Sequence, residues 1–305
     1  MLWILYYFGL IDLNVLRQSF DSPFYIILAT FLLLLTIPLA GYRWHLLLRS
    51  LEFTSSMLWA IKTTWVGCFC NLFFPGSCGG DIARGALAYR LTGAHLSKLS
   101  FSILVDRLTG LLSLVILAIC LIPWLPVQLH WWGYTILAVV LGVTVSACAL
   151  GALFGKKLAD YLEFKFGRVG ERVSHVIKEV ILATDAYVSH WPIVVYSVIL
   201  SIVQFIMILI SLFFVAIAMG FNDLTALNCF IAGLWSLFVN AIPISPGGLG
   251  VGEAAFNHLV ILLQENSSSL GYATIFLGYR VLAAVSSSIG VFLYVPVRDE
   301  IKNNL

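Results

Sequence analysis

Long uncharged stretches dominate the chain and predict helices that cross a membrane. No Asp, Glu, Lys or Arg occurs from Leu108 to Phe154 or from Ala186 to Asn222. Each run exceeds the roughly 20 residues that an α-helix needs to cross the hydrocarbon core of a bilayer. The pattern therefore predicts an all-α fold, a polytopic transmembrane helix bundle.

Charged residues, prolines and glycines mark the ends of the predicted elements. Spans are predicted over residues 22–42, 99–122, 131–154, 191–219, 225–242 and 272–296, with a short apolar helix at about 251–264. The first uncharged run ends at Arg43 and Arg49. Residues 1–11 are too short to span, and we interpret them as the second half of a helix that begins upstream.

Residues 156–190 differ from the rest because they carry six Lys or Arg and five Asp or Glu. Val and Ile recur at helical spacing between 169 and 181, which predicts an amphipathic helix on the membrane surface or packed on the bundle. This segment divides a single integral membrane domain, 1–305, into a first half at 1–154 and a second half at 191–305.

Basic loops of membrane proteins stay on the cytoplasmic side, which orients the chain. We therefore predict that the protein lies in the cytoplasmic membrane. Residues 156–190, the 81–98 loop and the C-terminus are placed on its cytoplasmic side. Residues 43–55 carry Arg43 and Arg49 and are also placed on the cytoplasmic side. Both this segment and the 81–98 loop can lie on that side only if 57–75 does not cross the membrane. We interpret 57–75 as a re-entrant segment.

The composition supports a membrane location and excludes other classes. Charged residues are 10% and hydrophobic residues 61% of the chain, whereas soluble domains carry roughly 25% charged residues. A formal net charge of +2 gives no reason to expect a nucleic-acid partner. The six cysteines form no CxxC pair and the six histidines no ligand pattern, so neither a metal nor a cofactor is predicted. The predicted partners are the lipid bilayer and a membrane lipid.

Two segments share an order of residues that interrupts helices. The first runs from Asn71 to Arg84 and the second from Asn240 to Glu253. Proline removes a backbone donor and glycine permits positive φ, so both residues break helices. The breaking residues are Pro75, Gly76, Gly79, Gly80, Pro243, Pro246, Gly247, Gly248 and Gly250.

Matching breaks in the two halves of a membrane protein indicate the binding site of a transporter. Irregular backbone is tolerated at membrane depth only where it is buried in protein or lines a watery cavity. A helix that restarts after a break also directs its N–H groups at an anion. We interpret the two halves as a candidate inverted repeat; the alternative is that both motifs are surface loops that turn the chain.

Polar and charged residues near the breaks are candidates for substrate binding. Glu253 is the only charge between Leu224 and Gln264, and an ionisable residue in such a run is a functional candidate. Arg280 lies inside the last span and is suited to pair with Glu253 or with a phosphate. The predicted substrate-binding set is Asn71, Asp81, Arg84, Asp106, Arg107, Asn240, Glu253 and Arg280.

Several of these residues also have structural interpretations. Glu253 is placed to complement the dipole of the helix that it opens. Asp81 and Arg84 are three residues apart and can pair with each other. Asp106 and Arg107 are equally suited to anchor a span at the interface. Asn71 and Asn240 are expected to hydrogen-bond the broken backbone.

The two motifs resemble those of the lysylphosphatidylglycerol synthase transmembrane-region family, which includes the flippase portion of the multiple peptide resistance factor. The resemblance rests on Pro-Gly-x-x-Gly-Gly-Asp-x-x-Arg at 75–84, Asp-Arg-Leu at 106–108, Pro-x-x-Pro-Gly-Gly-Leu-Gly-x-x-Glu at 243–253, and Arg280. This chain shows no soluble acyltransferase-like domain, so the resemblance implies lipid translocation rather than lipid synthesis.

The expected function is a flippase or transporter for a phospholipid, an aminoacyl-phospholipid or a polyprenyl-phosphate-type lipid. Arginines at 84, 107 and 280 would meet the phosphate, and acids at 81, 106 and 253 would balance charge, bind a cationic headgroup or couple to protons. The alternatives are a membrane-embedded transferase of lipid metabolism and a non-catalytic partner of a separately encoded lipid or glycan synthase. No nucleophile–base arrangement is recognised, and no catalytic residue is predicted.

Overall fold

The computed structural model describes residues 22–73, 78–92, 96–125, 130, 131, 133–135, 138, 182, 184–241, 250–264 and 271–303. The regular secondary structure of these residues is entirely helical, without a strand, which confirms the all-α prediction for them. In chain order the helices are α3 (Pro23–Ser50), α4 (Met57–Cys70), α5 (Cys78–Thr92), α6 (Leu96–Leu121), the 3-10 turn η2 (Ile122–Trp124), α8 (Trp191–Ala218), α9 (Ala226–Ala241), α10 (Val251–Leu263), α11 (Ala273–Ser288) and α12 (Gly290–Asn303).

Among the described residues, four helical stretches are long and apolar enough to cross a membrane. They are α3, α6 continued through η2, α8, and α11 continued into α12, each of 28 or 29 residues. They correspond to the spans predicted over 22–42, 99–122, 191–219 and 272–296. The span predicted over 225–242 is instead the 16-residue helix α9, which is shorter than the roughly 20 residues of a full crossing. The predictions for residues 1–11, 131–154 and 156–190 lie wholly or largely outside the described residues.

Helix α3 runs further than the sequence predicted, and it corrects the placement of Arg43. The prediction put Arg43 in a cytoplasmic loop after residue 42, but the helix continues to Ser50 and buries the Arg43 side chain. No Gly or Pro follows Arg43 in this helix to end it. The apolar residues Trp44, Leu47 and Leu48 in its last turns are buried. The helix ends where Glu52 adopts a positive φ of 63°.

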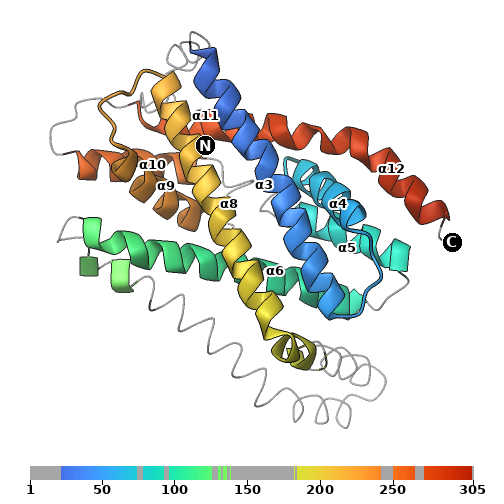
Figure 1. Cartoon of the computed structure of the whole chain (residues 1–305). Helices are drawn as coiled ribbons and strands as arrows, with labels where there is room; N and C mark the ends of the chain where they lie inside the picture. The colour runs from blue at the N-terminus through green and yellow to red at the C-terminus, as the bar shows by residue number, and fades with distance from the viewer. Residues whose placement is uncertain are drawn as a thin grey trace, which may run out of the picture.

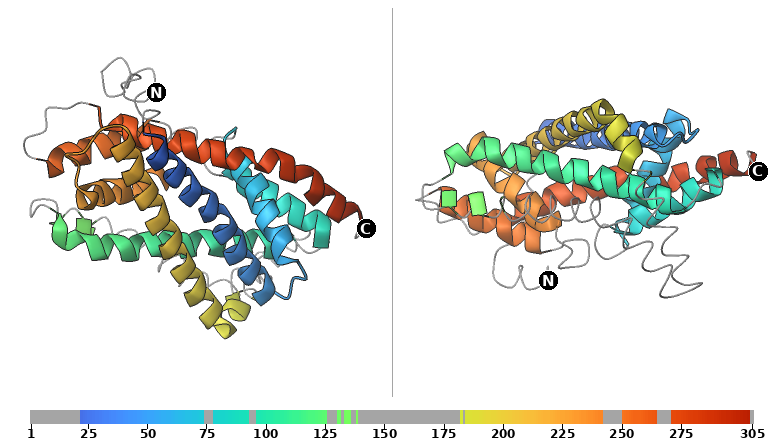
Figure 2. Two further views of the ribbon diagram at one scale, coloured as in Figure 1. Left: turned by 45° about the horizontal axis from the view of Figure 1, so that its top comes forward. Right: turned by 90° about the horizontal axis from the view of Figure 1, so that it is seen from below.

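Helices α3 and α8 pack along each other, and α6 crosses behind both (Figure 1). The short pairs α4–α5 and α9–α10 lie toward opposite ends of α6, as the further views in Figure 2 also show. Near its N-terminus α6 contributes Leu99 to a buried cluster that includes Trp44 and Trp59, and near its C-terminus it contributes Ala118 to a cluster that includes Ile231 of α9. The first motif thus separates the short helices α4 and α5, and the second separates α9 and α10. The two pairs lie toward opposite ends of the long helix α6. An inverted-repeat relationship and a re-entrant path for 57–75 stay predictions.

Close contact of two glycine-containing turns holds α4 against α5. A side chain at Gly67 would place its Cβ 2.9 Å from the Gly80 carbonyl oxygen, and a Cβ at Gly80 would collide with the Gly67 carbonyl oxygen. Asn71 reinforces the crossing because its Oδ1 accepts a 2.6 Å hydrogen bond from the Gly80 N–H. This contact fixes the start of α5, where Asp81 and Arg84 lie.

The last span is interrupted at Ile289, a break that the sequence interpretation of 272–296 as one span did not include. Trp65 of α4 donates its indole N–H to the Ser286 carbonyl at 2.9 Å. A side chain that takes a carbonyl from the helical ladder is one of the recognised causes of a kink. Beyond the break, Lys62 of α4 pairs with Glu300 at 2.6 Å and ties α12 to the same short helix.

We predict that Gly80→Ala destabilises the fold by about 1–3 kcal/mol, the usual cost of overpacking, because two backbones must separate. The midpoint of thermal unfolding in detergent, followed by tryptophan fluorescence, measures the change. Gly110→Ala is the matched control, since a Cβ at Gly110 in α6 meets nothing within 4 Å. Equal midpoints for the two variants would contradict the close approach of α4 and α5.

Candidate functional site

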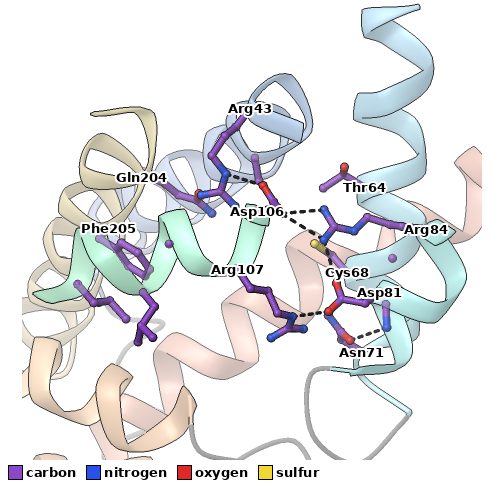
Figure 3. A pocket seen from close by; sticks show the side chains of 16 residues that line it. Arg43, Thr64, Cys68, Asn71, Asp81, Arg84, Asp106, Arg107, Gln204 and Phe205 are labelled. Carbon is purple, nitrogen blue, oxygen red and sulfur yellow. Dashed lines mark hydrogen bonds and ion pairs between the residues drawn. The ribbon is translucent and has the colours of Figure 1, made fainter. Parts of the chain in front are cut away.

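Five charged side chains form a chain of alternating sign inside the bundle (Figure 3). Arg43 Nε donates to Asp106 Oδ1 at 2.7 Å, and Asp106 Oδ2 accepts from Arg84 Nη1 and Nη2 at 3.3 and 3.2 Å. Arg84 Nη2 also donates to Asp81 Oδ1 at 2.8 Å, while Asp81 Oδ2 accepts from Arg107 Nε. We call this arrangement the charge chain. It runs from Arg43 through Asp106, Arg84 and Asp81 to Arg107.

The charge chain joins four helices that are distant in sequence. Arg43 belongs to α3, Asp81 and Arg84 to α5, and Asp106 and Arg107 to α6. Helix α8 takes part because Arg43 Nη1 donates to Ser201 Oγ at 2.5 Å and to Gln204 Oε1 at 3.3 Å. The helix period turns adjacent side chains about 100° apart, so Asp106 and Arg107 meet different partners.

Side-chain exposure increases from Asp106, next to Arg43, to Arg107 at the other end of the charge chain. The Asp106 side chain is 4% exposed, Asp81 18% and Arg107 42%. The Arg43 end is therefore the closed end, held between α3 and α8. The Arg107–Asp81 pair is the open end, where a ligand would first meet charge.

The charge chain lines a cavity of about 280 Å³. Its other lining residues include polar Thr64 and Asn71 and the apolar Leu111, Leu114 and Phe205. Figure 3 shows Gln204 and Phe205 across the cavity from Thr64 and Arg84. The Thr64 hydroxyl is buried and has no hydrogen-bond partner among the described residues. The cavity thus combines a polar wall with an apolar one.

Aromatic packing fixes the central arginine of the charge chain. The Arg84 guanidinium lies over the Trp44 ring, 5.0 Å from its centroid, and Trp44 is fully buried. Trp44 is itself held by a 3.3 Å hydrogen bond from its indole N–H to Ser102 Oγ of α6. A guanidinium over a desolvated tryptophan gains roughly 2 kcal/mol. The Arg84 guanidinium therefore contacts Trp44 through its planar face and the two carboxylates through its N–H groups.

Glu253 and Arg280 form a separate pair on α10 and α11. Arg280 Nη1 lies 3.3 Å from Glu253 Oε1, and Glu253 Oε2 accepts a 2.7 Å hydrogen bond from the N–H of Gly250. Gly250 begins α10 with a positive φ of 88°, which a glycine adopts without strain. Both sequence interpretations of Glu253, a partner for Arg280 and an acid at a helix N-terminus, describe it correctly.

The predicted site residues therefore divide into two groups. Asn71, Asp81, Arg84, Asp106 and Arg107 line the cavity, whereas Glu253, Arg280 and Asn240 are absent from its lining. Asn71 binds broken backbone as predicted. Asn240 Oδ1 is buried without a partner among the described residues. Of the breaking residues, Pro75, Gly76, Pro243, Pro246, Gly247 and Gly248 lie outside the described part of the chain, while Gly79, Gly80 and Gly250 lie within it.

A family model described as the lysylphosphatidylglycerol synthase TM region matches residues 1–287. The chain belongs to this family. The resemblance predicted from the motifs is confirmed, and with it a multi-pass membrane domain of the type found in lipid-modifying proteins. Comparison with curated proteins and with solved structures finds no significant match.

This member of the lysylphosphatidylglycerol synthase TM region family contains a site residue that sequence reasoning missed. Arg43 was interpreted as a loop charge, yet it closes the inner end of the charge chain. A signal existed, because Arg43 is followed by apolar residues at helical spacing without a helix stop, and an arginine inside a membrane helix needs a partner. The sequence did not indicate that this partner is Asp106. Across the described residues, no three His, Cys, Asp or Glu side chains converge as metal ligands would.

We predict that Asp106→Asn destabilises this family member by about 3–5 kcal/mol, because loss of one partner leaves buried charge uncompensated. Two buried guanidinium groups, those of Arg43 and Arg84, would lose their shared carboxylate. Thermal unfolding in detergent measures the effect. Asp299→Asn, an exposed acid on α12, is the control, and an equally small effect of both substitutions would disprove the structural role of Asp106.

Proposed function

We propose that this protein binds a phosphate-bearing membrane lipid by its headgroup and moves it between the two leaflets. The observation that carries the proposal is the cavity wall, where the charge chain runs from a buried end to an exposed Arg107. Membership of a family of membrane domains from lipid-modifying proteins supports a lipid ligand.

The charges of the cavity favour an anion. Three guanidinium groups and two carboxylates line it, which leaves one positive charge. A guanidinium binds phosphate oxygens in a planar, two-pronged geometry. Arg107 supplies that group at the open end, and the Thr64 hydroxyl and Gln204 amide add uncharged hydrogen-bonding groups further in.

The apolar wall of the same cavity suits a lipid better than a soluble phosphate. Leu111 and Leu114 of α6 and Phe205 of α8 stand beside the charged residues. A phosphate with a hydrocarbon chain would contact both surfaces at once, the phosphate at Arg107 and the first methylenes at Leu111 and Phe205. Burial of apolar surface contributes about 25 cal/mol per Å², which a water-soluble phosphate does not gain.

A polar cavity inside the bundle also addresses the main barrier to lipid movement. An ionised headgroup is strongly disfavoured in hydrocarbon, since transfer of a charge out of water costs many kcal/mol unless it is paired. The charge chain provides fixed partners at membrane depth.

We further propose that the C-terminus and 156–190 face the cytoplasm and that the protein resides in the cytoplasmic membrane. A separately encoded synthase would supply the lipid.

We predict that purified wild-type protein moves fluorescent phosphatidylglycerol across liposome membranes and that Arg107→Gln lowers the rate. Loss of a charge-assisted hydrogen bond of about 1.5–3 kcal/mol implies a decrease of roughly tenfold or more. Quenching of the outer-leaflet label with dithionite measures the movement. Arg90→Gln is the matched control because Arg90 is an exposed arginine on α5. The proposal fails if liposomes with wild type scramble the label no faster than empty liposomes across a panel of phospholipids and a polyprenyl phosphate.

The Glu253–Arg280 pair provides a separate prediction. We expect Glu253→Gln and Arg280→Ala to leave lipid binding to the detergent-solubilised protein unchanged, because neither side chain lines the cavity. Weaker binding by either folded variant would contradict the assignment of the headgroup to the charge chain.

A further inference from the structure

The two carboxylates of the charge chain are held differently. Asp106 binds Arg43 through Oδ1 and Arg84 through Oδ2, and it is almost completely buried. Asp81 binds Arg84 through Oδ1 and Arg107 through Oδ2 at the exposed end of the chain. Arg84 would keep Asp106 if Asp81 moved, because the two carboxylates approach it separately. The Asp81–Arg107 pair can therefore open without leaving Arg84 unpaired.

We propose that Asp81 competes with the lipid phosphate for Arg107 and so serves as the group that releases the lipid. This inference rests on the proposed function and deepens it. A carboxylate and a phosphate monoanion offer the same arrangement of oxygens to a guanidinium. The bound phosphate replaces Asp81 on Arg107, and the return of Asp81 expels it.

The strength of the pair suits this exchange. Ion pairs with substantial exposure contribute only modestly to stability because water screens them and solvates the separated charges. The Arg107 side chain is 42% exposed and that of Asp81 18%, so the pair can open at small cost. Asp106 lacks this property, since an anion that displaced it would leave a buried carboxylate without its arginines.

Competition by Asp81 predicts a different result from a role in which Asp81 itself attracts the lipid. Removing the competing charge strengthens the binding of the anion and weakens the step that frees it. Lipid affinity should rise while the transport rate falls. A substitution that merely damaged the fold would lower both.

The experiment measures binding and transport on the same preparations of Asp81→Asn and Asp81→Glu. Binding of fluorescent phosphatidylglycerol to the solubilised protein is followed by anisotropy, and transport by dithionite quenching in liposomes. We expect Asp81→Asn to bind about two- to fivefold more tightly, the range that a partly exposed ion pair implies, and to transport more slowly. Asp81→Glu, which restores the charge, should return both quantities toward wild type.

Further variants test the mechanism itself. The gain in affinity should vanish in the double variant Asp81→Asn with Arg107→Gln, because no guanidinium remains to be freed. Asp299→Asn, which removes an exposed acid on α12, should leave affinity unchanged. Unfolding midpoints confirm that each variant is folded. Unchanged or weaker binding by folded Asp81→Asn would overturn the inference.

Failure of this inference is distinguishable from failure of the proposed function. A wild type that moves no lipid contradicts the proposed function. A wild type that moves lipid, together with Asp81→Asn that binds no more tightly, contradicts only the competition. Glycerol 3-phosphate separates the two possible sources of the phosphate: we expect it to displace the labelled lipid weakly, and displacement at concentrations similar to those of the lipid would contradict the commitment to a lipid.

Discussion

Two guanidinium groups hold the carboxylate of Asp106 inside the helix bundle, and the arrangement of the surrounding helices depends on that contact. Arg43 approaches from α3 and Arg84 from α5, while Asp106 belongs to α6. None of these charges is stable alone in a low-dielectric interior, so each is buried only because the others are present. The helices that carry them must therefore meet at this point.

Close backbone contacts make that meeting possible. Gly67 and Gly80 let α4 and α5 approach until side chains on α5 reach α6. Trp44 fills the space beneath Arg84 and is itself bound to Ser102 of α6. Gly80 of the first motif thus has a packing role inside the first turns of α5. The motif is interpreted best as a device that sets the start of α5 and, with it, the positions of Asp81 and Arg84.

The same charge chain has one buried end and one exposed end. Burial and paired hydrogen bonds immobilise Arg43 and Asp106, whereas Arg107 and Asp81 meet the open part of the cavity. A rigid inner end keeps the cavity polar and its charges oriented, so that the proposed binding of a headgroup would need little reorganisation. In the proposed transport, the exposed end would provide the reversible contact, because tight and permanent binding would stop turnover.

Hydropathy alone predicted the membrane class and six spans, of which the structure confirms four as long apolar helices, since about 20 consecutive apolar residues are typical of a bilayer crossing. The span predicted over 225–242 is the shorter helix α9. Local chemistry likewise identified the helix breaks, the pairing of Asp81 with Arg84, the pairing of Glu253 with Arg280, and the family. The role of Arg43 needed the tertiary structure, because its partner Asp106 lies 63 residues away and only packing brings the two together. Tertiary structure also decided that the candidate residues form two groups rather than one. Periodicity reports which face of a helix is apolar, but which helices meet across a membrane depends on contacts between distant residues.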